Sequence, residues 1–287
     1  MKIIRKRLLP VLVTFAAAIG VIFTAIGGVH AQQEMLPAKF QESKVIRVGM
    51  QHDFAPMDFK DPKTGEETGV NYELLQAIAA KLGVKFEFFG VGFANLLPGL
   101  DTGRFDFVGA AIGDFPERRK KLTFVDYVTA GPYIVIRKES SKTIRGYEDI
   151  CGKPVAYLRY ISTFKTVLEE FNAKECVDKG RPEIELLTTD LRPKLGLLQK
   201  RFDAAMLTTE TVNWLMKLEP DTYSKIGEPL AKWHYGWAFL KDDTQLRDAI
   251  AAGLDAIILD GTYAKILEKY NQSELAVEKS GIDQGTF

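Results

Sequence analysis

The stretch GAAIGDFPERR, residues 109–119, indicates more about this chain than any other. Small apolar residues end a strand at a glycine, and Pro-Glu then opens a short helix with Arg118 near its start, because proline suits the first helical turn. Free backbone N–H groups at Gly113 and beyond, together with the guanidinium of Arg118, predict a pocket for a carboxylate or phosphate. Arg119 and Lys120 are assigned to a solvated face. A surface turn with a solvated Arg118 is the alternative for this stretch alone.

On both sides of this stretch, predicted strands alternate with predicted helices. The strands cover residues 45–50, 84–89, 105–112, 154–158, 184–187, 204–207 and 233–240, and the helices cover 72–81, 93–100, 163–171, 193–200, 209–216 and two segments within 245–270. This alternation predicts parallel sheets covered by helices on both faces, and its restart after residue 141 predicts two α/β halves. Ligands of open α/β sheets bind outside the carboxyl ends of strands, so a cleft between two such edges is expected.

The composition is that of an ordinary globular protein. The 287 residues are 46% hydrophobic and 26% charged, with a formal net charge of zero. Without the four basic residues among the first seven, 34 basic residues face 38 acidic ones, a net charge of about −4. No basic run with interleaved aromatic residues remains, so no nucleic-acid partner is expected. The three histidines show no metal-ligand spacing and no nucleotide-binding motif occurs, so no cofactor and no metal site are expected.

Residues 1–31 have the pattern of a signal peptide. Basic residues within 2–7 precede an apolar stretch at 8–28, and Val29 and Ala31 place small residues at the −3 and −1 positions of a cleavage site. The apolar stretch is also long enough to span a bilayer, so an uncleaved anchor is the alternative. We expect cleavage, export to the periplasm and a mature chain that begins near Gln32.

Cys151 and Cys176 are the two cysteines of the chain. Both belong to the portion expected to be exported, and an oxidising compartment favours a disulfide between them. Two buried free thiols are the alternative. No histidine or other base clusters with either cysteine in the sequence, so a nucleophilic role is not expected.

Several motifs around the opening stretch form an ordered series. They are VIRVGMQHDFAP from residue 45, GVNYEL from 69, LLPGL from 96, GRFD from 103, PER from 116, GKPV from 152, RFDA from 201, YGWA from 235 and LDGT from 259. Each is weak alone, but their order and spacing resemble those of the family 3 extracellular solute-binding proteins, the periplasmic amino-acid-binding proteins of ABC importers. The resemblance covers nearly all of the chain after the leader.

The resemblance implies an α/β fold of the type II periplasmic-binding-protein class. Each of two lobes would contain a mostly parallel sheet flanked by helices, and two crossover strands near residues 133–137 and 233–239 would form a hinge. Lobe 1 would comprise residues 42–134 plus 238–287, and lobe 2 residues 135–237. Hinge closure would trap a ligand between the lobes.

The resemblance also implies ligand-binding residues in the first lobe. Arg118 aligns with the arginine that binds the ligand α-carboxylate in this family. Phe54 and Phe93 align with aromatic residues that line the site, although core packing is an alternative for both. Ala111 and Gly113 complete this side at the end of their strand. The family often has Ser or Thr at the position of Gly113, so a hydroxyl contact is lost here.

In the second lobe, Ser162 and Thr163 open a predicted helix. We expect an N-cap role and, by resemblance, backbone N–H groups that bind the same carboxylate. Arg159 lies just before this pair and is a further candidate for ligand contact.

Thr208 departs from the family, which usually has an aspartate at this position that pairs with the ligand α-ammonium. Threonine carries no charge, and a buried ammonium needs a paired anion. Either Asp114 or Glu210 substitutes for the aspartate, or the ligand lacks a free α-amine.

The expected function is therefore capture of a small carboxylate-bearing solute, an amino acid or a related compound, and its delivery to the permease subunits of an ABC transporter. A monomer without enzymatic activity is expected. Periplasmic cyclohexadienyl (arogenate/prephenate) dehydratases share the fold, so a dehydratase-like enzyme is the rival hypothesis. A sensor subunit that presents its ligand to a membrane receptor is a third.

Overall fold

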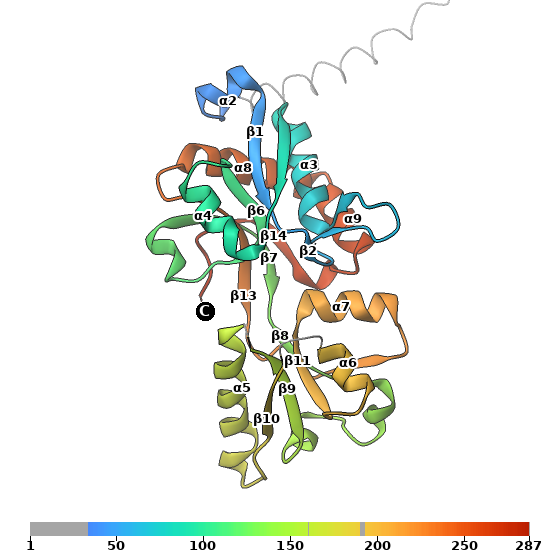
Figure 1. Cartoon of the computed structure of the whole chain (residues 1–287). Helices are drawn as coiled ribbons and strands as arrows, with labels where there is room; N and C mark the ends of the chain where they lie inside the picture. The colour runs from blue at the N-terminus through green and yellow to red at the C-terminus, as the bar shows by residue number, and fades with distance from the viewer. Residues whose placement is uncertain (1–33, 160, 190–192, 287) are drawn as a thin grey trace, which may run out of the picture.

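The computed structural model describes residues 34–159, 161–189 and 193–286, without the side chain of Ser162. The predicted signal peptide and the start near Gln32 lie outside the described residues. Two α/β lobes lie end to end in Figure 1, with the amino-terminal strands in the upper lobe and α5 (Ser162–Glu175) in the lower one. None of the helices in the described part of the chain has both the length and the hydropathy that crossing a bilayer requires.

The first lobe is built on a mixed six-stranded sheet. In spatial order its strands are β14 (Ala276–Ile282), β7 (Leu122–Ala130), β13 (Trp233–Leu240), β6 (Phe107–Gly113), β1 (Val45–Met50) and β5 (Lys85–Gly90). β1 runs parallel to β5 and β6, whereas β13 is antiparallel to β6 and β7, and β14 is antiparallel to β7. The parallel part of this sheet is thus confined to three strands.

Helices cover both faces of this sheet, and β6 shows why its sequence is apolar throughout. Val108, Ala110 and Ile112 pack in the core cluster that contains α4 (Leu96–Asp101), whereas Phe107 and Ala111 pack in the cluster that contains α3 (Val70–Leu82). Every residue of β6 is buried. A strand that is covered on both faces does not alternate between apolar and polar residues, which is why residues 107–113 form a continuous apolar run.

The second lobe contains a mixed five-stranded sheet. Its strands in spatial order are β10 (Glu185–Thr189), β9 (Pro154–Leu158), β11 (Ala204–Thr208), β8 (Pro132–Arg137) and β12 (Tyr223–Ile226). β9 is parallel to β10 and β11, and β8 is antiparallel to β11 and β12. The helices of this lobe are α5, α6 (Pro193–Leu198) and α7 (Thr209–Leu218).

Smaller elements complete the two lobes. The first lobe also contains α2 (Ala38–Ser43), α8 (Thr244–Leu259), α9 (Thr262–Lys269) and a three-stranded sheet of β2 (Asp53–Phe54), β3 (Asp58–Lys60) and β4 (Glu67–Thr68). The short 3₁₀ helices are η1 (Phe93–Asn95), η2 (Arg118–Lys120), η3 (Lys138–Lys142), η4 (Tyr147–Ile150), η5 (Val177–Lys179) and η6 (Ser273–Leu275).

The chain passes twice between the two sheets, at Gly131 and through residues 227–232. The crossings touch: a Cβ atom at Gly131 would lie 2.0 Å from the carbonyl oxygen of Ala231, so only glycine fits there. The expected crossover strands instead lie each within one sheet, β8 in the second and β13 in the first, because β13 pairs with β7 over its whole length. The expected boundary at residues 237 and 238 would cut β13, and we propose lobes of residues 34–130 plus 233–286 and of 132–226.

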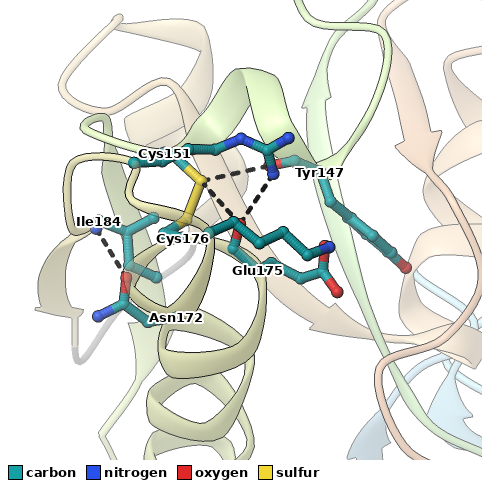
Figure 2. The surroundings of a disulfide bond; sticks show 8 residues. Tyr147, Cys151, Asn172, Glu175, Cys176 and Ile184 are labelled. Atoms are coloured by element: carbon teal, nitrogen blue, oxygen red, sulfur yellow. Dashed lines mark hydrogen bonds and ion pairs between the residues drawn. A yellow bond between two sulfur atoms is a disulfide. The ribbon is translucent and has the colours of Figure 1, made fainter.

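The disulfide between Cys151 and Cys176 is present, which confirms the prediction from the cysteine count and excludes the two free thiols. Figure 2 shows that it joins the segment after η4 to the carboxyl end of α5. Glu175, the last residue of α5, accepts a hydrogen bond on its carbonyl from Nη1 of Arg181 (2.9 Å). The disulfide and this hydrogen bond together fix the carboxyl end of α5.

We predict that replacing both cysteines by serine lowers the free energy of unfolding by about 3 kcal/mol, because the closed loop of 25 residues restricts the unfolded chain. Urea unfolding followed by tryptophan fluorescence measures this, with the reduced wild type as the control. Ligand affinity should stay unchanged, since neither cysteine lines the cavity that lies between the two lobes. Equal stabilities of oxidised wild type and double variant would show that the bond contributes nothing.

Candidate ligand-binding site

A cavity of about 980 Å³ lies between the two lobes, at the carboxyl ends of β6, β9 and β11. Its described lining consists of Gln51, Asp53, Phe54, Phe93, Ala111, Gly113, Phe115, Arg118, Leu158, Ile161, Thr163, Pro193, Lys194, Leu195, Leu198, Leu207, Thr208, Thr211, Leu215, Trp233 and Tyr235. Both sheets contribute, so a small molecule in this cavity would contact both lobes.

Arg118 contributes a desolvated cation to the first-lobe wall. Its Nη1 donates a hydrogen bond to the carbonyl of Gly113 (2.7 Å), and its Cζ lies 5.1 Å from the centre of the Phe115 ring. Burial lowers the pKa of Arg118, an effect that Tyr235 and Asp114 oppose, and an arginine stays protonated under such conditions. The remaining N–H donors of the guanidinium have the fork geometry that binds a carboxylate on two oxygens.

Phe115 explains the glycine that ends β6. A Cβ atom at Gly113 would lie 2.7 Å from Cζ of Phe115 and 3.2 Å from Nη1 of Arg118. A serine or threonine at this position would therefore displace the ring or the guanidinium. The missing hydroxyl at Gly113 is the consequence of an aromatic ring that occupies its space.

The expected row of free N–H groups beyond Gly113 is wrong. The N–H of Asp114 donates to the carbonyl of His234 (3.0 Å), and that of Phe115 donates to the carbonyl of Gly113 (3.1 Å). The expected helix is a single 3₁₀ turn, η2, which begins at Arg118 rather than at Pro116. The anion-binding group of this loop is therefore the Arg118 side chain.

The carboxylate of Asp114 points away from the cavity. It is fully buried, accepts a hydrogen bond from the N–H of Gly285 (2.6 Å) and pairs with Nε of Arg119 (3.0 Å). Nη1 of Arg119 also donates to the carbonyl of Asp283 (2.7 Å). Arg119 is thus mostly covered by the C-terminal segment instead of lying on a solvated face, and Asp114 is already neutralised by it.

The structure brings together most of the residues predicted to bind ligand. Those that line the cavity are Phe54, Phe93, Ala111, Gly113, Arg118, Thr163 and Thr208. Arg159 lies outside the described lining, and its Nη2 is 3.3 Å from Oγ1 of Thr188 on the neighbouring strand. The predicted N-cap at Ser162 is shifted by one residue, because α5 begins at Ser162 and Ile161 holds the cap position without a side-chain hydrogen bond.

Thr208 ends β11 in the second-lobe wall, and its Oγ1 lies 3.0 Å from Oγ1 of Thr211. Behind this wall, Glu210 is fully buried and accepts a hydrogen bond from the hydroxyl of Tyr235 (3.3 Å). Burial raises the pKa of Glu210 to about 7, although hydrogen bonds with Thr208 and Tyr235 oppose the shift. Glu210 is therefore close to the cavity without lining it.

The sequence does not indicate that Trp233, Tyr235 and the leucine side chains line the cavity. Trp233 and Tyr235 belong to an aromatic strand that reads as core, while Leu195 and Leu198 stand one turn apart on α6. Apolar periodicity identifies a buried face but cannot distinguish a core from the wall of a cleft. The aromatic run of β13 next to a lobe crossing is the one signal that marks this wall.

Two lobes with a shared cleft and a cation in its wall define a solute-binding protein of the two-lobed type. The model of the bacterial extracellular solute-binding proteins, family 3, matches residues 46–273, and the chain belongs to this family. A probable amino-acid-binding protein, YxeM of Bacillus subtilis (strain 168), is 26% identical over 93% of this chain and 97% of its own. The arginine-binding protein ArgT of Corynebacterium glutamicum is 26% identical over 88% of this chain and 82% of its own.

Solved structures agree with this assignment. An ancestral cationic amino acid solute binding protein, AncCDT-1, superposes with a TM-score of 0.68 at 30% identity, covering 81% of this chain and 97% of its own. The L-cystine solute receptor of Neisseria gonorrhoeae, in its unliganded open conformation, superposes with a TM-score of 0.65 at 25% identity, covering 81% and 94%. The type II fold expected from the sequence is confirmed.

We predict that Glu210→Gln flattens the pH dependence of stability. The pKa of Glu210 is about 7 in the folded protein and near 4.5 when unfolded, so between these values the folded state holds the extra proton. Stability should therefore fall as pH rises through this window, by up to about 1.4 kcal/mol per pH unit. Denaturant unfolding between pH 4.5 and 8 tests this, with the exposed Glu183→Gln as control. Identical slopes in wild type and Glu210→Gln would contradict it.

Proposed function

We propose that this protein captures a small carboxylate-bearing solute in the interlobe cleft and delivers it to the permease subunits of an ABC importer. The observation that carries the proposal is the desolvated guanidinium of Arg118 in the wall of a cavity shared by both lobes. Relatives named as amino-acid-binding and arginine-binding proteins, and a probable amino-acid ABC transporter-binding protein of Haemophilus influenzae that is 27% identical, support this role.

We propose that the ligand carboxylate lies between Arg118 and the amino-terminal end of α5. Thr163, in the first turn of α5, lines the cavity opposite the loop that follows β6. The first backbone N–H groups of a helix have no partner within the helix, and they favour an anion. A carboxylate held by both groups would join the lobes, and the two short crossings at Gly131 and residues 227–232 allow hinge closure around it.

We propose a binding role rather than catalysis. Among the described lining residues the single carboxylate is that of Asp53, whose Oδ1 accepts a hydrogen bond from the amide of Gln51 (2.9 Å). A dehydratase would need an acid or a base directed at the ligand. Export to the periplasm, through the leader at residues 1–31, and a monomeric state belong to the same proposal.

We predict that Arg118→Ala abolishes high-affinity binding while the fold persists. Removing one partner of a desolvated ion pair costs about 2–5 kcal/mol, or roughly 30- to several-thousand-fold in affinity. Thermal-shift screening of amino acids and 2-oxo acids identifies a ligand, and titration calorimetry with that compound measures the loss.

Lys120→Ala is the matched control, because Lys120 is a neighbouring cation whose Nζ pairs with Glu117 outside the cavity (2.6 Å). Its affinity should equal that of the wild type. If Arg118→Ala binds as tightly as Lys120→Ala, the ligand carboxylate is not at Arg118 and the proposed function loses its main support.

A further inference from the structure

We infer that the cleft is built for a monocarboxylate that has an apolar body and no free ammonium group, such as an apolar 2-oxo or 2-hydroxy acid. This inference rests on the proposed function, since it assumes that Arg118 binds the carboxylate. The charges and the apolar surface of the lining determine which ligand body the rest of the cavity accepts.

The described lining contains a single carboxylate, and it lies at the edge of the cavity. Its charged residues are Arg118, Lys194 and Asp53, and Lys194 is paired with Glu219 through its Nζ. Asp53 is exposed at the edge of the cavity and is hydrogen-bonded to Gln51. Transfer of an ammonium group into a cleft is costly unless an anion meets it there. The described interior walls offer no such anion.

Two other carboxylates lie near the walls, and neither lines the cavity. Asp114 is fully buried on the opposite side of its loop, where Arg119 and the N–H of Gly285 bind it. Glu210 has no exposed surface and lies behind Thr208 and Tyr235, which separate it from the cavity. An ammonium in the cleft would reach Asp114 only by displacing Arg119 or the N–H of Gly285, and it would reach the unpartnered Oε2 of Glu210 only if Thr208 or Tyr235 moved.

Apart from Lys194, whose Nζ pairs with Glu219, the described polar side chains of the second-lobe wall are neutral. Thr208 and Thr211 present two hydroxyls 3.0 Å apart, whereas the hydroxyl of Tyr235 donates to Glu210 behind them. A hydroxyl can both donate and accept a hydrogen bond. These groups can bind a keto or hydroxyl oxygen without any charge on the ligand.

Apolar side chains from both lobes face the open cavity. Phe93 in the first lobe is 49% exposed, and Leu195 and Leu198 on α6 are 50% and 42% exposed. Large apolar side chains exposed together in a cleft mark a surface that is covered on binding. Leu158, Ile161, Leu207, Leu215, Phe54 and Trp233 extend this surface. The ligand that buries it carries an apolar body rather than a second polar or cationic end.

Matched pairs of compounds test the inference. The wild type, freed of bound ligand by unfolding and refolding, is titrated with 4-methyl-2-oxopentanoate against L-leucine, with phenylpyruvate against L-phenylalanine, and with L-arginine. Members of each pair differ only in the keto or amino group. We expect at least one 2-oxo acid to bind at least about tenfold more tightly than the amino acid of its pair. L-arginine should bind more weakly than either member of that pair.

Thr208→Asp adds the missing anion, and Thr208→Asn is its neutral control of the same size. The aspartate variant should bind the 2-oxo acid about tenfold more weakly than the asparagine variant, because the new carboxylate is placed in the cleft without a cation. In the aspartate variant, the ratio of the affinity for the 2-oxo acid to that for the amino acid should fall, or the preference should reverse.

Two results would overturn the inference while leaving the proposed function intact. One is an amino acid that binds the wild type as tightly as its 2-oxo acid, and the other is L-arginine as the preferred ligand, each with binding lost in Arg118→Ala. Loss of that amino-acid binding in Glu210→Gln would then identify Glu210 as the ammonium partner. Failure of every carboxylate to bind, or binding independent of Arg118, would instead overturn the proposed function and this inference together.

Discussion

The buried carboxylate of Asp114 is the interaction on which the binding wall depends. It lies one residue after β6 and is held by the N–H of Gly285 and by Nε of Arg119. A carboxylate without exposed surface is stable only when it is paired and hydrogen-bonded, and breaking such a pair costs about 3–5 kcal/mol. Arg119 bonds to Asp114 and to the C-terminal segment. Its neighbour Arg118 therefore lies on the opposite side of the loop and faces the cleft.

A second constraint is the contact between the two crossings. Gly131 lies so close to the carbonyl of Ala231 that the two connections form one narrow junction between the sheets. Thr209, the first residue of α7, donates to the carbonyl of Gly131 from both its N–H and its hydroxyl, at 2.8 Å each. Glu274 of the first lobe also accepts hydrogen bonds from Tyr133 and Asn213 of the second. In the hinge closure that we propose, the second lobe rotates about the crossings, and these contacts shift or break as it does so.

The sequence predicted the regular part of this fold and, in both lobes, residues that line the cavity, for identifiable reasons. The apolar run of β6, the helical spacing of α3 and the chain order of the motifs all carry local signals. β14 has no such signal, because it is an edge strand that has a single buried residue and forms through its pairing with β7. The direction of Asp114 depends on Gly285, 171 residues away, and no local pattern contains that contact. Long-range pairings of this kind also decide which of two adjacent arginines faces the ligand.

The most direct measurement is a crystal structure of the wild-type protein with the small molecule that it carries through purification. We predict a carboxylate of that molecule within hydrogen-bonding distance of the Arg118 guanidinium, with its body between Phe93 and α6. A ligand without an acidic group would contradict the account, as would a structure in which the acidic group lies elsewhere and Arg118 still bonds only to the carbonyl of Gly113.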